Sequence, residues 1–167
     1  MPILPIKIYG SDVLRQQASP VEKMTDDLRR MIGEMRDSLY YHQGAGLAAN
    51  QIGVPRQIFL ADDGRGLLVC INPRIVELEG KAVAEEGCLS LPEIYIDIER
   101  ADSLKLEYLD QDWELKQIDA EGLLCRIIQH EVDHLKGVLI SDRAGFVTRK
   151  LIAGKLRKLE KRVQESF

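Results

Sequence analysis

Cysteine is scarce in this sequence, and long apolar segments are absent from it. The chain has 3 cysteines among 167 residues, scattered and without any Cys-x-x-Cys pair. This scarcity excludes a disulfide-rich scaffold, and in a reducing compartment the thiols would be free for packing or for binding a metal. No apolar run approaches the ~20 residues that a membrane-spanning helix needs, so we expect no membrane partner.

Targeting segments, internal repeats and low-complexity stretches are also absent. The chain begins Met-Pro-Ile-Leu-Pro-Ile-Lys, which lacks the pattern of a signal peptide or of a transit peptide. We therefore expect a cytoplasmic protein. Hydrophobic residues make up 45% and charged residues 30% of the chain, a composition typical of globular proteins. No linker divides the chain, so we predict a single domain over residues 1–167.

The net charge of −4 is small, but it is unevenly distributed. Residues 143–167 hold eight Lys or Arg against two Glu, whereas residues 1–142 hold 15 basic and 25 acidic side chains. The local charges are therefore +6 and −10. Such a basic end is usually a solvated surface, and the alternative is a binding site for a polyanionic partner.

Apolar spacing predicts one helix early in the chain and six short strands after it. Thr25 is typical of a helix N-cap, and apolar residues recur at helical spacing from Leu28, which predicts a helix that ends near Tyr41. Glycine, Asp and the Asn72-Pro73 pair are typical of turns between the later segments. The strands are expected at Gln57–Ala61, Leu67–Ile71, Arg74–Leu78, Ile94–Ile98, Leu104–Leu109 and Trp113–Ile118.

Two further helices are predicted after the strands. Asp119 is predicted to cap a helix that runs to Lys136, and a last helix is expected from about Thr148 to Gln164. Residues 148–167 would thus form a basic C-terminal helix. The order of elements indicates an α+β fold, with antiparallel sheets packed around the helix that ends at Lys136.

The central helix carries the sharpest motif in the chain, His130-Glu131-Val132-Asp133-His134. Residues four apart lie about 40° from each other around a helix and one turn along it, so both imidazoles can bind one metal ion. The carboxylate of Glu131 would then reach a water at that ion rather than the ion itself. The alternative is a solvated helix that happens to carry two histidines.

A catalytic metal site needs a third protein ligand and one open position. The extended protease form of this motif ends in a third histidine, but Ile140 stands at that position. The only later glutamates, Glu160 and Glu165, lie in the basic tail. His42 closes the first predicted helix and belongs to no ligand pattern.

The cysteines remain as sources of the third ligand. Cys125 lies about 140° around the helix from His130, and Cys70 lies in an apolar strand, so both are predicted to pack in the core. Cys88 differs because it follows a glycine and precedes Leu-Ser-Leu-Pro, on a predicted turn where a thiolate can face a cleft. We therefore predict Cys88 as the third ligand.

One further segment, Gly44-Ala-Gly-Leu-Ala-Ala-Asn-Gln51, is rich in small residues and ends in an amide. Its glycines and alanines allow another group to approach the backbone closely, and Gln51 offers N–H donors. The alternative is a tight connection from helix to strand. It is not a phosphate-binding loop, because no Lys-Ser/Thr pair follows.

Three segments of the chain resemble the signature motifs of the peptide deformylase family, in the same order. They are Gly44-Ala-Gly-Leu-Ala-Ala-Asn-Gln51, Glu86-Gly-Cys-Leu-Ser90 and Gln129-His-Glu-Val-Asp-His-Leu-Lys-Gly137. The resemblance implies a metal-dependent hydrolase that removes the formyl group from the N-terminal formyl-methionine of newly synthesised polypeptides. Its products would be formate and a free amine.

The resemblance also implies a role for each matching residue. Glu131 would be the general acid/base, and Gln51 and the backbone N–H of Leu89 would bind the oxyanion. Gly46 would contribute main-chain contacts to the substrate. The metal would be ferrous iron in the cell, with zinc, nickel or cobalt as alternatives in purified protein. Its ligands would be Cys88, His130 and His134.

Three residues are expected to line the pocket for the substrate side chain: Ala45, Arg126 and Ile127. Ala45 stands where a larger aliphatic residue is common in the family, and Arg126 stands where other members carry an aliphatic residue. If both line the mouth of the pocket, it would be wider and more polar on one side. The alternative for Arg126 is that it points to solvent. Glu86, Asp133 or Gln129 is expected to orient a metal ligand through a hydrogen bond.

Other functional interpretations remain open at this point. The basic helix over residues 148–167 can dock on ribosomal RNA near the nascent-chain exit, and nothing in the sequence indicates binding to DNA. An endopeptidase is disfavoured because the usual third protease ligands are missing. A ribosome-associated module with a purely structural metal site is disfavoured because it would leave Glu131 without a task.

Overall fold

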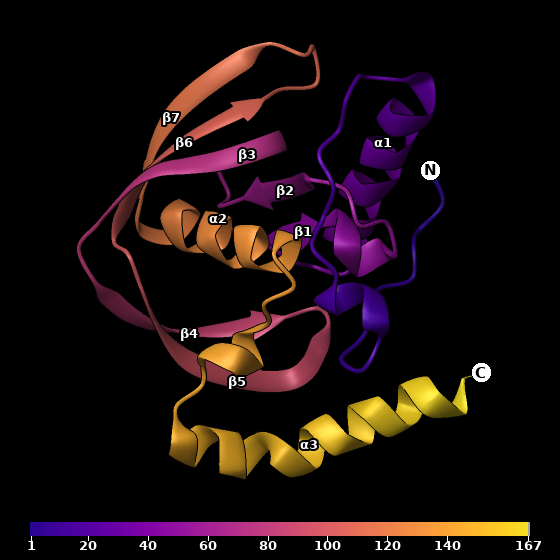
Figure 1. Ribbon diagram of the computed structural model, residues 1–167, viewed down its shortest axis with the longest axis vertical. Coiled ribbons are helices and arrows are strands. Elements are labelled where there is room, and N and C mark those ends of the chain that lie inside the picture. The colour runs from indigo at the N-terminus through magenta and orange to yellow at the C-terminus, as the bar shows by residue number, and fades with distance from the viewer. Residues whose placement is uncertain (167) are drawn as a thin grey trace.

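The computed structural model describes residues 1–166 and has an α+β fold built around the helix that carries the two histidines (Figure 1). The helices are α1 (Asp26–Tyr41), α2 (Gly122–Leu135) and α3 (Phe146–Glu165), with short 3-10 helices η1 (Asp12–Arg15), η2 (Ala49–Ile52) and η3 (Ile140–Arg143). The strands are β1 (Gly46–Ala48), β2 (Ile58–Asp62), β3 (Leu67–Glu79), β4 (Ala82–Cys88), β5 (Leu91–Arg100), β6 (Ser103–Leu109) and β7 (Leu115–Glu121).

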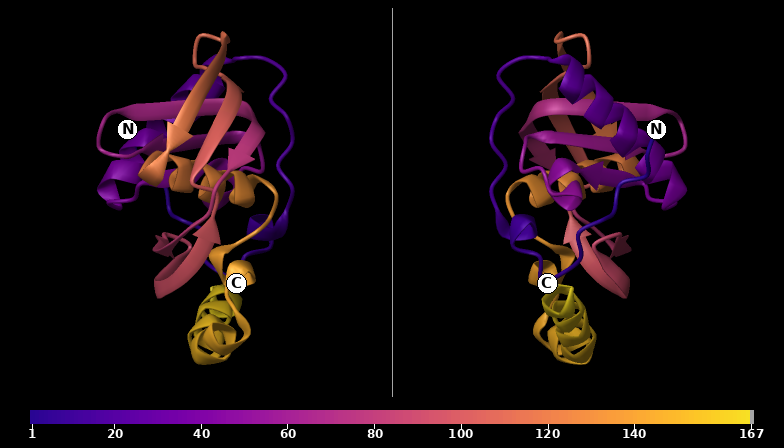
Figure 2. Two further views of the ribbon diagram at one scale, coloured as in Figure 1. Left: turned by 90° about the vertical axis from the view of Figure 1, so that its left-hand side faces the viewer. Right: turned by 90° about the vertical axis from the view of Figure 1, so that its right-hand side faces the viewer.

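Two antiparallel sheets enclose α2. The larger sheet has the strand order β1-β2-β3-β6-β7, and the smaller one is the β4–β5 hairpin. Figures 1 and 2 show α2 between the larger sheet and this hairpin, with α3 on the far side of the hairpin. The predicted α+β class and central helix are therefore confirmed. No helix within residues 1–166 is both long and apolar enough to span a bilayer.

Helix α1 forms where the sequence predicts it. The Thr25 side chain accepts a hydrogen bond from the backbone N–H of Leu28 at 3.1 Å and so caps the helix. Ile32, Met35 and Leu39 form its buried stripe against one face of the larger sheet.

Helix α2 begins later than predicted, because Asp119 belongs to β7. Residues 115–121 pair in register with β6, and Leu104 lies opposite Ala120, so the strand continues past the expected cap. Gly122 has φ +61°, which lets the chain leave the strand and enter the helix directly. The proposed N-cap at Asp119 was therefore wrong.

The predicted turn at Asn72-Pro73 is also wrong, because β3 runs through it. Asn72 has φ +49° within a bulge in the pairing of β3 with β6, and the bulge accommodates the proline, which has no N–H to donate. The Asn72 side chain stabilises the bulge by bonding the N–H and the carbonyl of Val21, each at 2.8 Å.

Strands β1 and β4 were missed from the sequence. β1 has three residues, and β4 contains a Glu-Glu-Gly run in which no apolar alternation is visible. The Gly44–Gln51 segment is thus more than a connection, since it supplies β1 and most of η2. Cys88 is the last residue of β4, directly before the two-residue turn Leu89-Ser90.

The apolar core has three parts, and two of them lie on opposite faces of the larger sheet. α1 packs on one face, while Ile128 and Val132 of α2 pack on the other, beside Phe59 and Leu106. Cys70 and Cys125 are buried with this second group, as predicted. The third part joins the apolar side chains of β5 to those of α3.

We predict that the Leu106→Ala variant loses about 2–5 kcal/mol of the free energy of unfolding, because truncating this fully buried side chain leaves a cavity beneath α2. Denaturation by urea measures the loss. The matched control is Leu115→Ala on the neighbouring strand β7, where the side chain is 72% exposed. Its free energy of unfolding should change by less than about 0.5 kcal/mol. Equal losses in the two variants would contradict the assignment of this core.

Candidate metal centre

The three predicted ligands meet at one point between α2 and the hairpin. The ligand atoms of Cys88, His130 and His134 all lie within 4.8 Å of one another. Cys88 Sγ is 3.3 Å from His134 Nε2, and the two imidazole rings lie 5.0 Å apart, one helical turn along α2. Two distant segments of the chain thus supply one set of candidate ligand atoms.

This arrangement fits one divalent transition-metal ion. Ligand distances of ~2.0–2.3 Å around a tetrahedral ion place neighbouring donor atoms roughly 3.3–3.8 Å apart, close to the sulfur–nitrogen separation observed. Three donors leave one position open. Burial lowers the pKa of His134 and so favours the neutral imidazole that a ligand needs. At His130 burial also lowers the pKa, but the hydrogen bonds with Cys88 and Glu86 outweigh it and raise the pKa, so a metal ion would displace a proton from that ring. Beside the ligands, the buried Oε1 of Glu131 has no hydrogen-bond partner in the described residues.

Glu86 orients the first histidine. Its Oε1 accepts a hydrogen bond from His130 Nδ1 at 2.9 Å, which leaves Nε2 of the ring for the metal. Burial raises the pKa of Glu86, but the hydrogen bonds from His130 and Arg100 outweigh it and lower the pKa to about 2. Of the three residues expected to orient a ligand, Glu86 is the one placed to do so.

The other two candidates have different partners. Asp133 bonds Arg100 and Arg143, and Gln129 bonds the backbone of Ala101. They support the surrounding structure rather than a metal ligand directly.

Glu131 is buried beside the ligands and has an unusual pKa. It is 1% exposed, and burial raises its pKa to about 7 although the positive charges of His130 and Arg100 act in the opposite direction. Gly46 makes room for it, because a Cβ at that position would lie 2.8 Å from the Glu131 carboxyl carbon. A carboxyl group with this pKa can exchange a proton near neutral pH.

Gln51 presents its amide group to the sulfur of Cys88. Its Oε1 accepts from the backbone N–H of Ala48 at 2.9 Å, and its Nε2 donates to Ser90 Oγ at 3.0 Å, so the side chain is held from both sides. The same Nε2 lies 3.8 Å from Cys88 Sγ. Leu89 occupies the hairpin turn directly after this cysteine.

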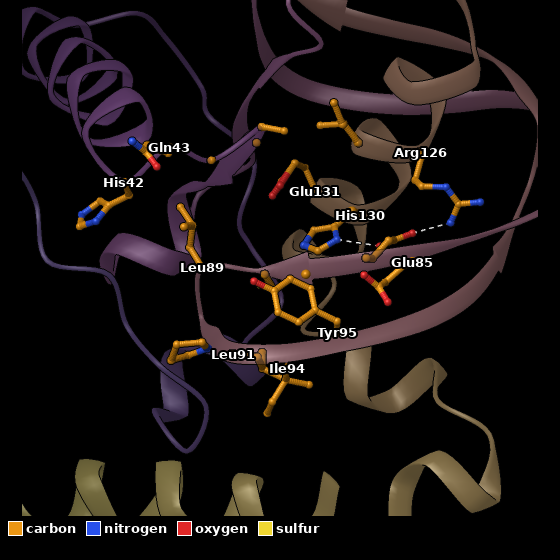
Figure 3. A pocket seen from close by; sticks show the side chains of 18 of the residues that line it. His42, Gln43, Glu85, Leu89, Leu91, Ile94, Tyr95, Arg126, His130 and Glu131 are labelled. Carbon is orange, nitrogen blue, oxygen red and sulfur yellow. Dashed lines mark hydrogen bonds and ion pairs between the residues drawn. The ribbon is translucent and has the colours of Figure 1, made fainter. Parts of the chain in front are cut away.

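A cavity of about 540 Å³ opens beside these groups. Figure 3 shows Glu131 and His130 projecting from α2 toward the hairpin that carries Tyr95. His134 is buried and does not line the cavity, but the other predicted site residues do. They are Ala45, Gly46, Gln51, Cys88, Leu89, Arg126, Ile127, His130 and Glu131.

Several lining residues were not anticipated. Glu85 and Tyr95 belong to the hairpin and Leu123 to the first turn of α2. A prediction of β4 would have placed Glu85 on the strand that ends at Cys88. His42 also lines the cavity, but it is not part of the ligand cluster, and its Nε2 lies 3.3 Å from the carbonyl of Leu4.

Arg126 does not point to solvent, so that alternative was wrong. Its side chain is 12% exposed, and its guanidinium donates to Glu86 Oε2 at 2.7 Å, to the carbonyl of Ile98 at 2.9 Å and to that of Ala82 at 2.8 Å. It forms a wall of the cavity while its charged end is held by the hairpin.

Residues 3–150 match the family model of polypeptide deformylase. Among curated relatives, the peptide deformylase of Thermotoga maritima is 41% identical over 160 residues, 95% of this chain and 98% of that protein. That of Desulfitobacterium hafniense is 43% identical over 150 residues, 90% of this chain and 100% of that protein.

Solved structures show the same likeness. The crystal structure of the Thermotoga maritima enzyme has a TM-score of 0.85 at 42% identity and covers 87% of this chain and 99% of that one. The Synechococcus elongatus peptide deformylase, solved in complex with actinonin, has a TM-score of 0.88 at 38% identity and covers 93% of this chain and 87% of that one.

The raised pKa of Glu131 predicts a pH-dependent difference in stability between the metal-free protein and its Glu131→Gln variant. The folded protein keeps the Glu131 proton up to about pH 7, whereas the carboxyl group of an unfolded glutamate loses its proton near pH 4.5. As pH rises from 4.5 to 7, ionisation therefore favours the unfolded state and lowers the free energy of unfolding of the parent. The variant, measured relative to the parent, should gain about 2–4 kcal/mol in free energy of unfolding from pH 4.5 to pH 8. Urea denaturation after chelation measures this gain, and a constant difference would contradict it.

Proposed function

The chain belongs to the polypeptide deformylase family, and on that premise we propose that Cys88, His130 and His134 hold one divalent metal ion at its active site. The protein removes the formyl group from the N-terminal formyl-methionine of newly synthesised polypeptides and releases formate. The observation that carries the site assignment is the cluster of three ligand atoms next to a cavity that Cys88, His130 and Glu131 line. Within residues 1–166, the Glu131 carboxyl oxygen Oε1 has no hydrogen-bond partner.

The catalytic roles divide among three residues of this chain. When bound, a divalent ion supplies a Lewis acid that lowers the pKa of water toward neutrality. Glu131 accepts the proton of the attacking water and later donates it to the leaving amine. Gln51 Nε2 and the backbone N–H of Leu89 donate to the oxygen of the formyl group as negative charge develops there.

The substrate binds in the 540 Å³ cavity with its peptide chain between two strand edges. β1 is at the edge of the larger sheet, and within residues 1–166 β4 pairs only with β5, so both present backbone groups to an added strand. Gly46 supplies main-chain contacts from β1. Ala45, Arg126 and Ile127 surround the first side chain of the substrate. Selection of the acyl group is separate: the carbonyl carbon of a formyl group carries only hydrogen, so a tight site admits a formyl group and excludes an acetyl group.

The metal in the cell is ferrous iron, and zinc, nickel or cobalt can replace it in purified protein. Thiolate and imidazole ligands suit all four ions, so the donor set agrees with this list without choosing among its members. Because one ligand is a thiolate, oxidation of Cys88 removes the ligand and inactivates the protein.

Residues 1–167 act as one catalytic domain in the cytoplasm. The basic C-terminal helix of this domain docks on the ribosome. Ile152 and Leu159 of α3 are buried against β5, which leaves Lys158, Lys161 and Arg162 exposed. An exposed row of cations on a helix favours phosphate contacts of the kind that ribosomal RNA provides.

The catalytic assignment predicts that anaerobically purified protein releases formate from formyl-Met-Ala-Ser. The Glu131→Gln variant keeps the shape of the side chain but cannot exchange the proton, so its kcat should fall by at least about 10²-fold with the metal still bound. Formate release and metal content are measured together. A parent protein that binds one metal ion tightly but releases no formate would point instead to a structural metal site.

The docking assignment predicts that a Lys158→Glu, Lys161→Glu, Arg162→Glu variant binds ribosomes more weakly than the parent. Binding of the parent should weaken steeply as salt rises, because each phosphate contact releases a counterion, and the variant should show a shallower salt dependence. Co-sedimentation with ribosomes at several salt concentrations measures both. Unchanged binding by the variant would refute docking through this helix, and its formate release serves as the control for folding.

A further inference from the structure

The metal ligands belong to two elements that pack against different parts of the protein. His130 and His134 lie on α2, which packs on the larger sheet, whereas Cys88 ends β4, in a hairpin whose apolar side packs toward α3. Apolar packing places each element, and it includes Leu89 at the tip of the hairpin. Polar side chains that cross from α2 to the hairpin add direct connections close to the sulfur.

Arg126 makes the broadest of these connections. From the helix its guanidinium reaches the carbonyl of Ala82 on β4, the carbonyl of Ile98 on β5, and the carboxylate of Glu86. One planar group thus contacts both strands of the hairpin. Its attachment at Glu86 lies two residues before Cys88.

The Glu86 carboxylate bonds a second residue of α2 as well. Glu86 Oε2 accepts a hydrogen bond from Arg126, and Oε1 accepts one from His130 Nδ1 at 2.9 Å. Arg126 and His130 lie one helical turn apart on α2. Two neighbouring positions of the helix therefore hold one carboxylate of the strand that ends in Cys88. Arg100 also bonds Glu86, so the carboxylate keeps a charged partner if Arg126 is removed.

We propose that Arg126 is a positioning residue that holds Cys88 at the distance from His130 and His134 that a metal ion requires. This inference rests on the proposed metal site. The role needs a guanidinium, because three acceptors on two strands lie around a planar fork, whereas the single ammonium of a lysine cannot span them. Loss of Arg126 should therefore loosen the metal more than it loosens the fold.

The experiment compares Arg126→Met and Arg126→Lys with the parent, each loaded with Zn²⁺. The rate of metal release to a chromogenic chelator and the melting temperature are measured for all three. Arg126→Met should release zinc at least about 10-fold faster, as expected when a group that holds a metal ligand is disturbed. The zinc-release rate of Arg126→Lys should be close to that of Arg126→Met, because an ammonium group carries the charge but cannot bond both strands as the guanidinium does.

Arg15→Met is the matched control. Arg15 also makes a two-pronged ion pair, with Asp142, but it does not line the cavity. This variant should lower the melting temperature without changing zinc release. If Arg126→Met releases zinc at the parent's rate, or if Arg126→Lys restores that rate fully, the positioning role through the guanidinium fork is refuted.

Steady-state kinetics on formyl-Met-Ala-Ser separates positioning from a role in the pocket alone. With metal in excess, Arg126→Met should lower kcat more than it changes KM, because the misplaced ligand affects the reaction rather than substrate binding. A raised KM with unchanged kcat would assign Arg126 to the pocket wall only and overturn the proposal. Failure of the parent to bind zinc or release formate would instead count against the proposed function.

Discussion

The buried carboxylate of Glu86 is the contact on which the rest of the site depends. It is 6% exposed and bonds Arg100, Arg126 and His130, which come from β5 and from two turns of α2. A buried charge is strongly unfavourable unless it is paired and hydrogen-bonded, so this carboxylate constrains its partners to one geometry. Through it the hairpin, the helix and the first histidine are held together.

The same burial produces the chemistry of Glu131. Glu86 and Glu131 are both close enough to His130 for its charge to affect them, yet the pKa of Glu86 is about 2 and that of Glu131 is about 7. The difference arises because hydrogen bonds from His130 and Arg100 outweigh burial at Glu86, whereas burial dominates at Glu131, whose Oε1 has no hydrogen-bond partner within residues 1–166. The same pocket thus holds one carboxylate, Glu86, that stays ionised and another carboxyl group, Glu131, that can exchange a proton near neutral pH.

Local patterns in the sequence were sufficient for some elements and insufficient for others. The Thr25 cap and the spacing of His130 and His134 are set by residues close in the chain, and both predictions agree with the structure. The Asn72-Pro73 turn and the Asp119 cap were wrong because pairing with β6 overrode local preference. The solvent-facing alternative for Arg126 was wrong because its acceptors lie 28 to 44 positions away in the chain.

The sequence by itself determined the α+β class and the family, because both depend on residue identity and short-range spacing. It also favoured Cys88 over Cys70 and Cys125 from their local settings. Only the tertiary structure decided that Glu86 orients His130, that Gly46 leaves room for Glu131, and that Arg126 joins α2 to the hairpin. These contacts arise when two sheets close around one helix, and no short-range pattern encodes which distant groups then meet.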